Sequence, residues 1–120
     1  MKFATLDLDF SICKINDISG VDFSRLFVFL SKTDEEISLV CESKHVPANA
    51  TAVEPDWKGF RVDGVLDFGL VGVIASITKV LADAEISVFV VSTYNTDYVF
   101  LKFDDFDRGL ELVKQTIKKG

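Results

Sequence analysis

Polar and apolar residues alternate along the first residues of the chain, and this period of two predicts a β-strand at residues 2–9. Residues 10–15 repeat the alternation and predict a second strand. Short apolar runs at residues 26–30 and 37–41, separated by an acidic turn, predict two more strands. The first third of the chain is therefore expected to be mostly β-structure.

Two stretches of the first half carry weaker signals. Residues 21–26 fit a single helical turn that Asp22 or Ser24 would cap. Residues 42–57 contain two prolines and several small residues, so they predict a loop whose large apolar anchor is Trp57.

The second half alternates strand and helix patterns. Strands are predicted at residues 58–62, 86–92 and 97–103, with a turn at 94–96. A helix is predicted at residues 70–85, and a second one begins at Asp104. The expected buried stripes are Leu70, Val73, Ile74, Ile77 and Leu81 on the first helix, and Phe106, Leu110, Val113 and Ile117 on the second.

The element order from residue 58 onward is strand, helix, strand, strand, helix, which is five of the six elements of a ferredoxin-like βαββαβ unit. The strand at residues 2–9 is available to fill the open edge of that sheet. The first half gives a thinner version of the same order. We therefore expect an α+β fold of two related ferredoxin-like units that share strands, with residues 1–56 forming a degenerate N-terminal unit, residues 57–120 forming the C-terminal unit, and neither unit closed by itself.

The composition excludes some classes of function. The 120 residues include 13 basic and 19 acidic side chains, a net charge of −6, and the longest basic run is Lys118-Lys119. Phosphate recognition depends on clustered cations, so we expect no nucleic-acid partner and no anionic-membrane partner. Since 48% of residues are apolar, the fold needs no metal and no disulfide to hold it together, and we expect no cofactor.

The chain shows no apolar leader and no membrane-spanning run, and we expect a cytoplasmic protein. Cys13 and Cys41 lie in apolar runs and are expected to be buried reduced thiols. A disulfide between them stays possible if their strands are neighbours. His45 is the single histidine and lies in a polar stretch, so no zinc site is expected.

A glycine-containing segment between a strand and a helix is the first candidate for binding. Gly64, Gly69 and Gly72 permit tight backbone turns, and the free N–H groups of the following helix form a site for a carboxylate. No Gly-Lys-Ser/Thr sequence follows, so the segment is not a phosphate-binding P-loop. The alternative is that these glycines serve only tight turning and close packing.

The second candidate is the polar turn at residues 92–98, with the sequence STYNTDY. Its hydroxyl and amide groups can bind a polar ligand, and Asp97 can accept hydrogen bonds from an ammonium group. The alternative is an ordinary turn with exposed polar side chains.

Three stretches of the sequence resemble the ACT-domain family: residues 66–76 (LDFGLVGVIAS), 82–89 (ADAEISVF) and 92–99 (STYNTDYV). The chain is most similar to small tandem ACT proteins, which are related to the ACT repeats of the eukaryotic cytosolic arginine sensor. Residues 33–41 (TDEEISLVC) are similar to the N-terminal half of that branch.

The resemblance implies paired ferredoxin-like units that bind an amino acid at an interface between ACT units. The glycine segment would hold the α-carboxylate of the ligand through backbone N–H groups, and the polar turn would face its amino group or side chain. The implied ligand-binding residues are Gly64, Val65, Leu66, Asp67, Phe68, Gly69, Gly72, Ser92, Thr93, Tyr94, Asn95 and Asp97.

Three functions compete. The first is a non-enzymatic amino-acid-binding or sensing module that signals through a homo-oligomer or a regulated partner protein. The second is a protein-interaction scaffold that keeps the fold without a ligand. The third, a small enzyme, is disfavoured because Asp67, Asp97, Tyr94 and His45 form no recognisable triad, metal set or cofactor motif. Val71 and Val80 lie outside the main stripe of the first predicted helix, which fits either a dimer or a two-sided internal core.

Overall fold

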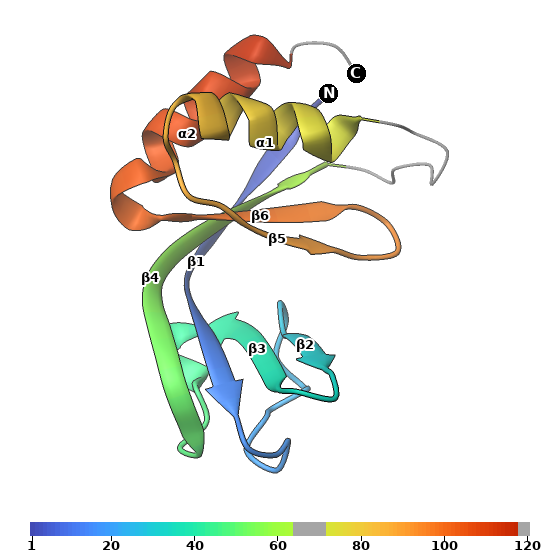
Figure 1. Cartoon of the computed structure of the whole chain (residues 1–120), viewed down its shortest axis with the longest axis vertical. Coiled ribbons are helices and arrows are strands. Elements are labelled where there is room, and N and C mark those ends of the chain that lie inside the picture. The colour runs from blue at the N-terminus through green and yellow to red at the C-terminus, as the bar shows by residue number, and fades with distance from the viewer. Residues whose placement is uncertain (64–71, 118–120) are drawn as a thin grey trace. The chain divides into compact units, whose positions relative to one another are not determined.

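The computed structural model describes residues 1–63 and 72–117 as a mixed α+β fold (Figure 1). Hydrogen bonding places the strands in the order β2-β3-β1-β4-β6-β5. The elements are β1 (Phe3–Ile15), β2 (Phe29–Lys32), β3 (Ile37–Glu42), the 3-10 helix η1 (Ser43–His45), β4 (Ala50–Val62), α1 (Val73–Asp83), β5 (Phe89–Ser92), β6 (Asp97–Lys102) and α2 (Phe103–Thr116).

The chain divides into two compact units. Unit 1 combines Met1–Asp7 with Lys58–Gly120, and unit 2 is Leu8–Trp57. The long strands β1 and β4 therefore contribute residues to both units. The N-terminal strand joins the C-terminal part of the chain, which is the position that we expected for residues 2–9.

In unit 1, both helices lie over one face of the strands (Figure 1). The apolar faces of α1 and α2 meet the inward-facing residues of β4 and β6, because alternate strand residues point to the same side. The buried core consists of Phe60, Val62, Ile77, Leu81, Ile86, Val99, Leu101, Phe106, Leu110 and Val113.

Of the predicted stripes, Leu70 lies outside the described residues and Ile117 follows the end of α2, whereas the other positions are buried in the core of unit 1 or pack against it. Ile77 and Leu81 of α1 are buried, and the bounds of α1 are narrower than the predicted 70–85. Val80 packs against the same core rather than forming a separate apolar face, so it gives no support to a dimer. In α2, Asp104 and Asp105 occupy the first turn and Lys114 the last, which matches the helix dipole.

In unit 2, the β2–β3 hairpin and the second part of β1 form a small apolar core of Cys13, Ile15, Leu39 and Cys41. The strands of the two cysteines are hydrogen-bonded neighbours, with Ser11 opposite Cys41 and Cys13 opposite Leu39. Both thiols are free and buried, as expected. Within the described residues no helix is long and apolar enough to cross a membrane.

The two hairpins repeat with an offset of 60 residues. Strands β2 and β3 begin at residues 29 and 37, and β5 and β6 begin at residues 89 and 97. The registers also correspond, because Lys32 pairs with Ile37 as Ser92 pairs with Asp97. The burial pattern of β3 is identical to that of β6. Related sequence positions therefore form the same hairpin in each unit.

Three local predictions were wrong. Residues 2–9 and 10–15 form one continuous strand, β1, rather than two. Strand β4 begins at Ala50, inside the stretch predicted as a loop. Residues 21–26 form no helix, because the Asp22 carboxylate accepts a hydrogen bond from the backbone N–H of Ser24 and closes a local turn instead.

Candidate functional site

The end of β4 is fixed on both sides within unit 1. The backbone N–H of Asp63 donates to the carbonyl oxygen of Lys2 at 2.8 Å. On the other side, the buried hydroxyl of Thr96 donates to the carbonyl oxygen of Val62 at 2.8 Å. The polar turn between β5 and β6 is thus hydrogen-bonded to the strand end that leads into the predicted glycine segment.

The polar turn has a defined internal geometry. The backbone N–H and the hydroxyl of Thr93 both donate to the carbonyl oxygen of Thr96, at 2.8 and 3.0 Å. Across the mouth of the hairpin, the hydroxyl of Ser92 donates to the Asp97 carboxylate at 2.6 Å. Tyr94 is 80% exposed and Asn95 is also exposed. Five of the predicted binding residues therefore lie in one solvent-facing turn.

Gly72 is the described part of the glycine segment. It adopts a φ of 87° as the residue before α1, a left-handed conformation that glycine takes without strain. Its carbonyl oxygen accepts a hydrogen bond from the N–H of Ser76. The remaining predicted residues of this segment, Gly64, Val65, Leu66, Asp67, Phe68 and Gly69, lie outside the described residues.

A basic side chain that was not predicted from the sequence contacts the residue that follows the polar turn at 92–97. Arg61, on β4, donates to the hydroxyl of Tyr98 on β6 at 3.3 Å, and its guanidinium carbon lies 5.9 Å from the centre of the Tyr98 ring. Both side chains are partly buried. Because the two residues are 37 positions apart, no local spacing in the sequence predicts their contact.

The end of β4 also borders an open concavity of about 410 Å³. Its charged side chains are Lys2, Asp63 and Lys114, and the side chains of Met1, Phe3 and Ile117 supply apolar surface. Two basic side chains and one carboxylate at this position contrast with the net charge of −6 of the whole chain.

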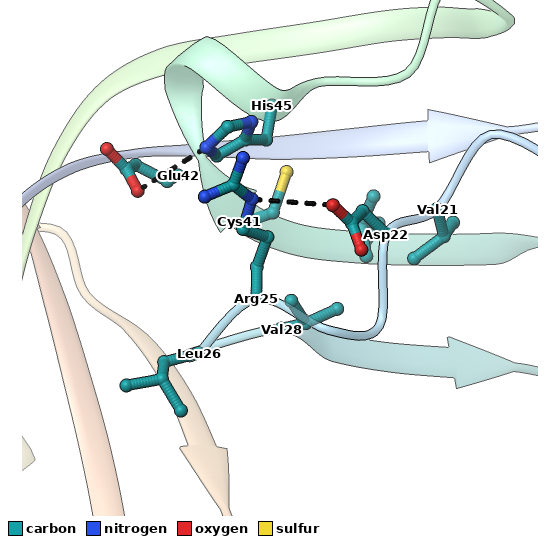
Figure 2. Close-up of a pocket in the computed structure, with 9 residues that line it drawn as sticks. Val21, Asp22, Arg25, Leu26, Val28, Cys41, Glu42 and His45 are labelled. Carbon is teal, nitrogen blue, oxygen red and sulfur yellow. Dashed lines mark ion pairs between the residues drawn. The ribbon is translucent and has the colours of Figure 1, made fainter.

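Unit 2 contains a separate, more enclosed pocket, which Figure 2 shows with the residues that line it. Its apolar lining comes from Val21, Val28, Leu39 and Cys41, and Leu26 lies at its edge with a 79% exposed side chain. The enclosed volume is about 10 Å³, which admits about one water-sized group.

Four charged or titratable side chains complete that pocket. Arg25 pairs through Nε with the Asp22 carboxylate at 3.4 Å. Glu42 Oε1 lies 3.9 Å from His45 Nε2, which exceeds a hydrogen-bond distance. His45 Nε2 is buried and has no hydrogen-bond partner. This site was not predicted from the sequence, because its residues come from two segments without recognisable spacing.

The described residues offer little for metal or thiol chemistry. Within residues 1–63 and 72–117, no group of three His, Cys, Asp or Glu side chains could hold a metal ion. Hydrogen bonding between the buried thiols lowers the pKa of Cys13 and, together with burial, raises the pKa of Cys41. Such a buried pair of thiols is suited to packing rather than to nucleophilic catalysis.

Comparison with known proteins gives a coherent picture. A sequence profile described as ACT domain matches residues 52–114, just over half of the chain. No curated protein matches the sequence.

Solved structures extend the likeness to nearly the whole chain. An Agobacterium tumefaciens protein is similar with a TM-score of 0.83 and 25% identity, over 95% of this chain and 87% of that one. A chain from the structure of aspartokinase alpha and beta subunits gives a TM-score of 0.72 and 12% identity, over 99% of both chains. The regulatory subunit of aspartate kinase from Thermus thermophilus gives 0.63 and 13%, over 97% of both. At 12% and 13% identity, the likeness to the aspartate kinase structures establishes the fold alone.

Proposed function

The chain belongs to the ACT domain family, and from this membership and the geometry of unit 1 we propose that it is a non-enzymatic regulatory module that binds a free amino acid. The proposed site combines the polar turn at residues 92–97 with the glycine segment at residues 64–72. The structural likeness to the regulatory subunit of aspartate kinase supports a regulatory rather than a catalytic role.

One observation carries the proposal: the buried hydrogen bond from Thr96 to Val62. It attaches the polar turn to the end of β4, from which the glycine segment leaves. The bond joins the polar turn to the strand end that precedes the glycine segment in the sequence. A fixed junction of this kind would hold ligand-binding groups in a constant position.

The chemistry of the exposed groups suits a zwitterion. The Asp97 carboxylate accepts hydrogen bonds from an ammonium group, and the hydroxyl of Ser92, already bonded to it, fixes its orientation. Backbone N–H groups at the start of α1 favour a carboxylate. A free amino acid carries both an ammonium group and a carboxylate.

We further propose that the fold is a tandem of two ACT-like halves, residues 1–56 and residues 57–120, with the first half degenerate. The hairpin repeat with its offset of 60 residues supports this relationship. In the first half the short helix η1 follows β3, whereas the long helix α2 follows β6 in the second. A ligand at an interface between ACT units, a closer similarity to the arginine sensor, a cytoplasmic location and a dimer or partner protein remain predictions.

A thermal-shift screen against the common amino acids tests the proposal. A ligand present at about 100 times its Kd should stabilise the folded protein by about 2.7 kcal/mol. A raised Tm with one amino acid, or with a chemically related group of them, supports the proposal. The absence of any shift at millimolar concentration would contradict it.

The alternative is a ligand-free interaction scaffold. Exposed apolar side chains on one segment of unit 2, Ile18, Phe23 and Leu26, favour it because such residues often contact partners. A scaffold should form a stable oligomer or complex whose mass, measured by analytical ultracentrifugation, is independent of every amino acid. An oligomer that changes mass when an amino acid is added would instead support the regulatory module.

A further inference from the structure

Large apolar side chains are exposed together on one segment of unit 2. Ile18, Phe23 and Leu26 are 48%, 57% and 79% exposed, and all three stand within residues 18–26. Single apolar side chains are common on protein surfaces, whereas several large ones gathered on one segment are typical of an interaction surface. The segment at residues 16–28, which connects β1 to β2, is therefore examined for what it could bind.

A repeated three-residue pattern presents two of these side chains. Asp17-Ile18-Ser19 and Asp22-Phe23-Ser24 each place an apolar residue between an aspartate and a serine. In both turns the aspartate carboxylate accepts hydrogen bonds from the backbone N–H and the hydroxyl of the serine. Each turn thus closes through its first and last residues, and its middle residue is left exposed to solvent.

The segment is fixed to the rest of unit 2. Asn49 Nδ2 donates to the carbonyl and carboxylate oxygens of Asp17, both at 3.3 Å. Val21 packs against the small apolar core of the unit. The ring of Phe27 meets the ring of Phe10 edge to face, with 6.4 Å between their centres. A surface that is already ordered loses little conformational entropy when a partner binds.

The distribution of charge indicates which partner would fit. Unit 2, residues 8–57, contains nine acidic and four basic side chains, a net charge of −5, whereas the rest of the chain contains ten acidic and nine basic side chains, a net charge of −1. Within the 16–28 segment the basic side chain is Arg25, and it pairs with Asp22 at 3.4 Å. Hydrogen bonds from the serines hold the pKa of Asp17 and Asp22 below the usual range, so both carboxylates stay charged at neutral pH.

The same charge disfavours two other occupants. Two copies of unit 2 placed face to face would each bring a net charge of −5 and repel one another. An anionic membrane surface attracts basic segments and would repel this one. A protein segment with basic and apolar side chains complements both the charge and the exposed apolar groups.

We propose that the 16–28 segment of unit 2 is a docking surface for a segment of a partner protein that carries both basic and apolar side chains. Ile18, Phe23 and Leu26 would supply the apolar contact, and the acidic side chains of unit 2 would attract and orient the basic ones. The surface shares no residue with the amino-acid site proposed for unit 1, so the two proposals are tested separately.

A synthetic amphipathic peptide of leucine and lysine is the probe, and the backbone amide NMR spectrum of the labelled protein is the readout. The peptide should shift the resonances of residues 17–26 in a saturable manner, and added salt should weaken its binding. Peptides with glutamate in place of lysine, or serine in place of leucine, should not shift them. The inference is overturned if the resonances of residues 17–26 do not move, or if shifts spread over both units without a maximum there.

Substitutions of exposed residues test the apolar contact without disturbing the core. Phe23→Ser and Leu26→Ser should each weaken peptide binding about tenfold. Val53→Ser is the matched control, because Val53 is a 44% exposed residue of unit 2 outside the segment, and it should leave the affinity unchanged. Equal losses in all three proteins would mean unspecific apolar contact and contradict the assignment. A dimer in sedimentation that Phe23→Ser dissociates would assign the surface to a second copy of the chain, and the inference would again be wrong.

Discussion

Thr96 and Val62 are joined by a buried hydrogen bond of 2.8 Å, 34 residues apart in the chain. The bond runs from the hydroxyl of Thr96, in the turn between β5 and β6, to the last residue of β4. It joins the polar turn to the strand end that precedes the glycine segment in the sequence, and the proposed amino-acid site depends on it.

Replacement of Thr96 by Val keeps the shape of the side chain and removes its donor. The carbonyl oxygen of Val62 then loses a buried partner, and we expect the free energy of unfolding in urea to fall by about 1–2 kcal/mol. Thr78→Val is the control, because the hydroxyl of Thr78 bonds to carbonyl groups of its own helix. Equal effects of the two substitutions would show that the Thr96 bond contributes nothing special.

Asp97→Ala tests the polar turn as a binding surface. It removes the carboxylate that accepts from Ser92 and, in our proposal, from the ligand ammonium group. We expect the affinity for the amino acid found in the thermal-shift screen to fall about tenfold or more, with stability changed by less than about 0.5 kcal/mol.

Asp83→Ala is the control for that substitution, since Asp83 is an exposed aspartate of α1 that pairs with Lys79. It should leave ligand affinity unchanged. Unaltered binding by the Asp97→Ala protein would remove the turn from the proposed site.

Gly109 is a buried residue of α2 that packs against the core of unit 1. A β-carbon added there would lie 2.6 Å from Leu101 Cδ1 and 3.1 Å from Leu81 Cδ2, both on fully buried side chains. Overpacking costs about 1–3 kcal/mol, and the gain in helix propensity is about 1 kcal/mol.

We therefore expect Gly109→Ala to lower the free energy of unfolding by up to about 2 kcal/mol. Thr116→Ala, on the exposed part of the same helix, should change it by less than about 0.5 kcal/mol. A Gly109→Ala protein as stable as wild type would mean that α2 can move away from β6 at little cost.

Two aspartates of unit 2 have depressed pKa values for a local reason. The carboxylate of Asp17 accepts bonds from the hydroxyl and the N–H of Ser19, and Asp22 accepts the same pair from Ser24, which holds the pKa of both below the usual range. A depressed pKa stabilises the folded state above the ordinary aspartate pKa, and this contribution is lost as the pH falls through the folded-state pKa.

Ser19→Ala should raise the pKa of Asp17 towards its ordinary value and leave Asp22 low, and Ser24→Ala should do the reverse. Carboxyl carbon NMR titration measures both groups in each protein, so each substitution is the control for the other. If Ser19→Ala leaves the titration of Asp17 unchanged, the hydroxyl bond is not the cause.

The sequence predicted the elements whose burial is periodic. Ile77 and Leu81 lie four residues apart on α1 and are both buried, and the β5–β6 hairpin has its turn in the predicted place. Strand β4 was missed before Trp57 because Thr51–Asp56 are exposed and show no alternation. Such a stretch is a strand because of its pairing with neighbouring strands, which local sequence does not encode.

The same reasoning explains what was found and missed at the sites. The polar turn was visible because five of its residues stand together in the chain. Its bond to Val62, the contact of Arg61 with Tyr98 and the pocket around His45 all join segments far apart in sequence. Side-chain contacts of that kind follow from topology, and no spacing rule predicts them from one sequence.

The most direct test of an amino-acid site in unit 1 is the backbone amide NMR spectrum of labelled protein titrated with the common amino acids. We predict that one of them shifts the amide resonances of residues 93–97 and Gly72 in a saturable manner, while resonances of residues on the exposed face of α2 stay in place. If every amino acid leaves residues 93–97 unmoved at millimolar concentration, the polar turn is not a ligand site and the proposed function is contradicted.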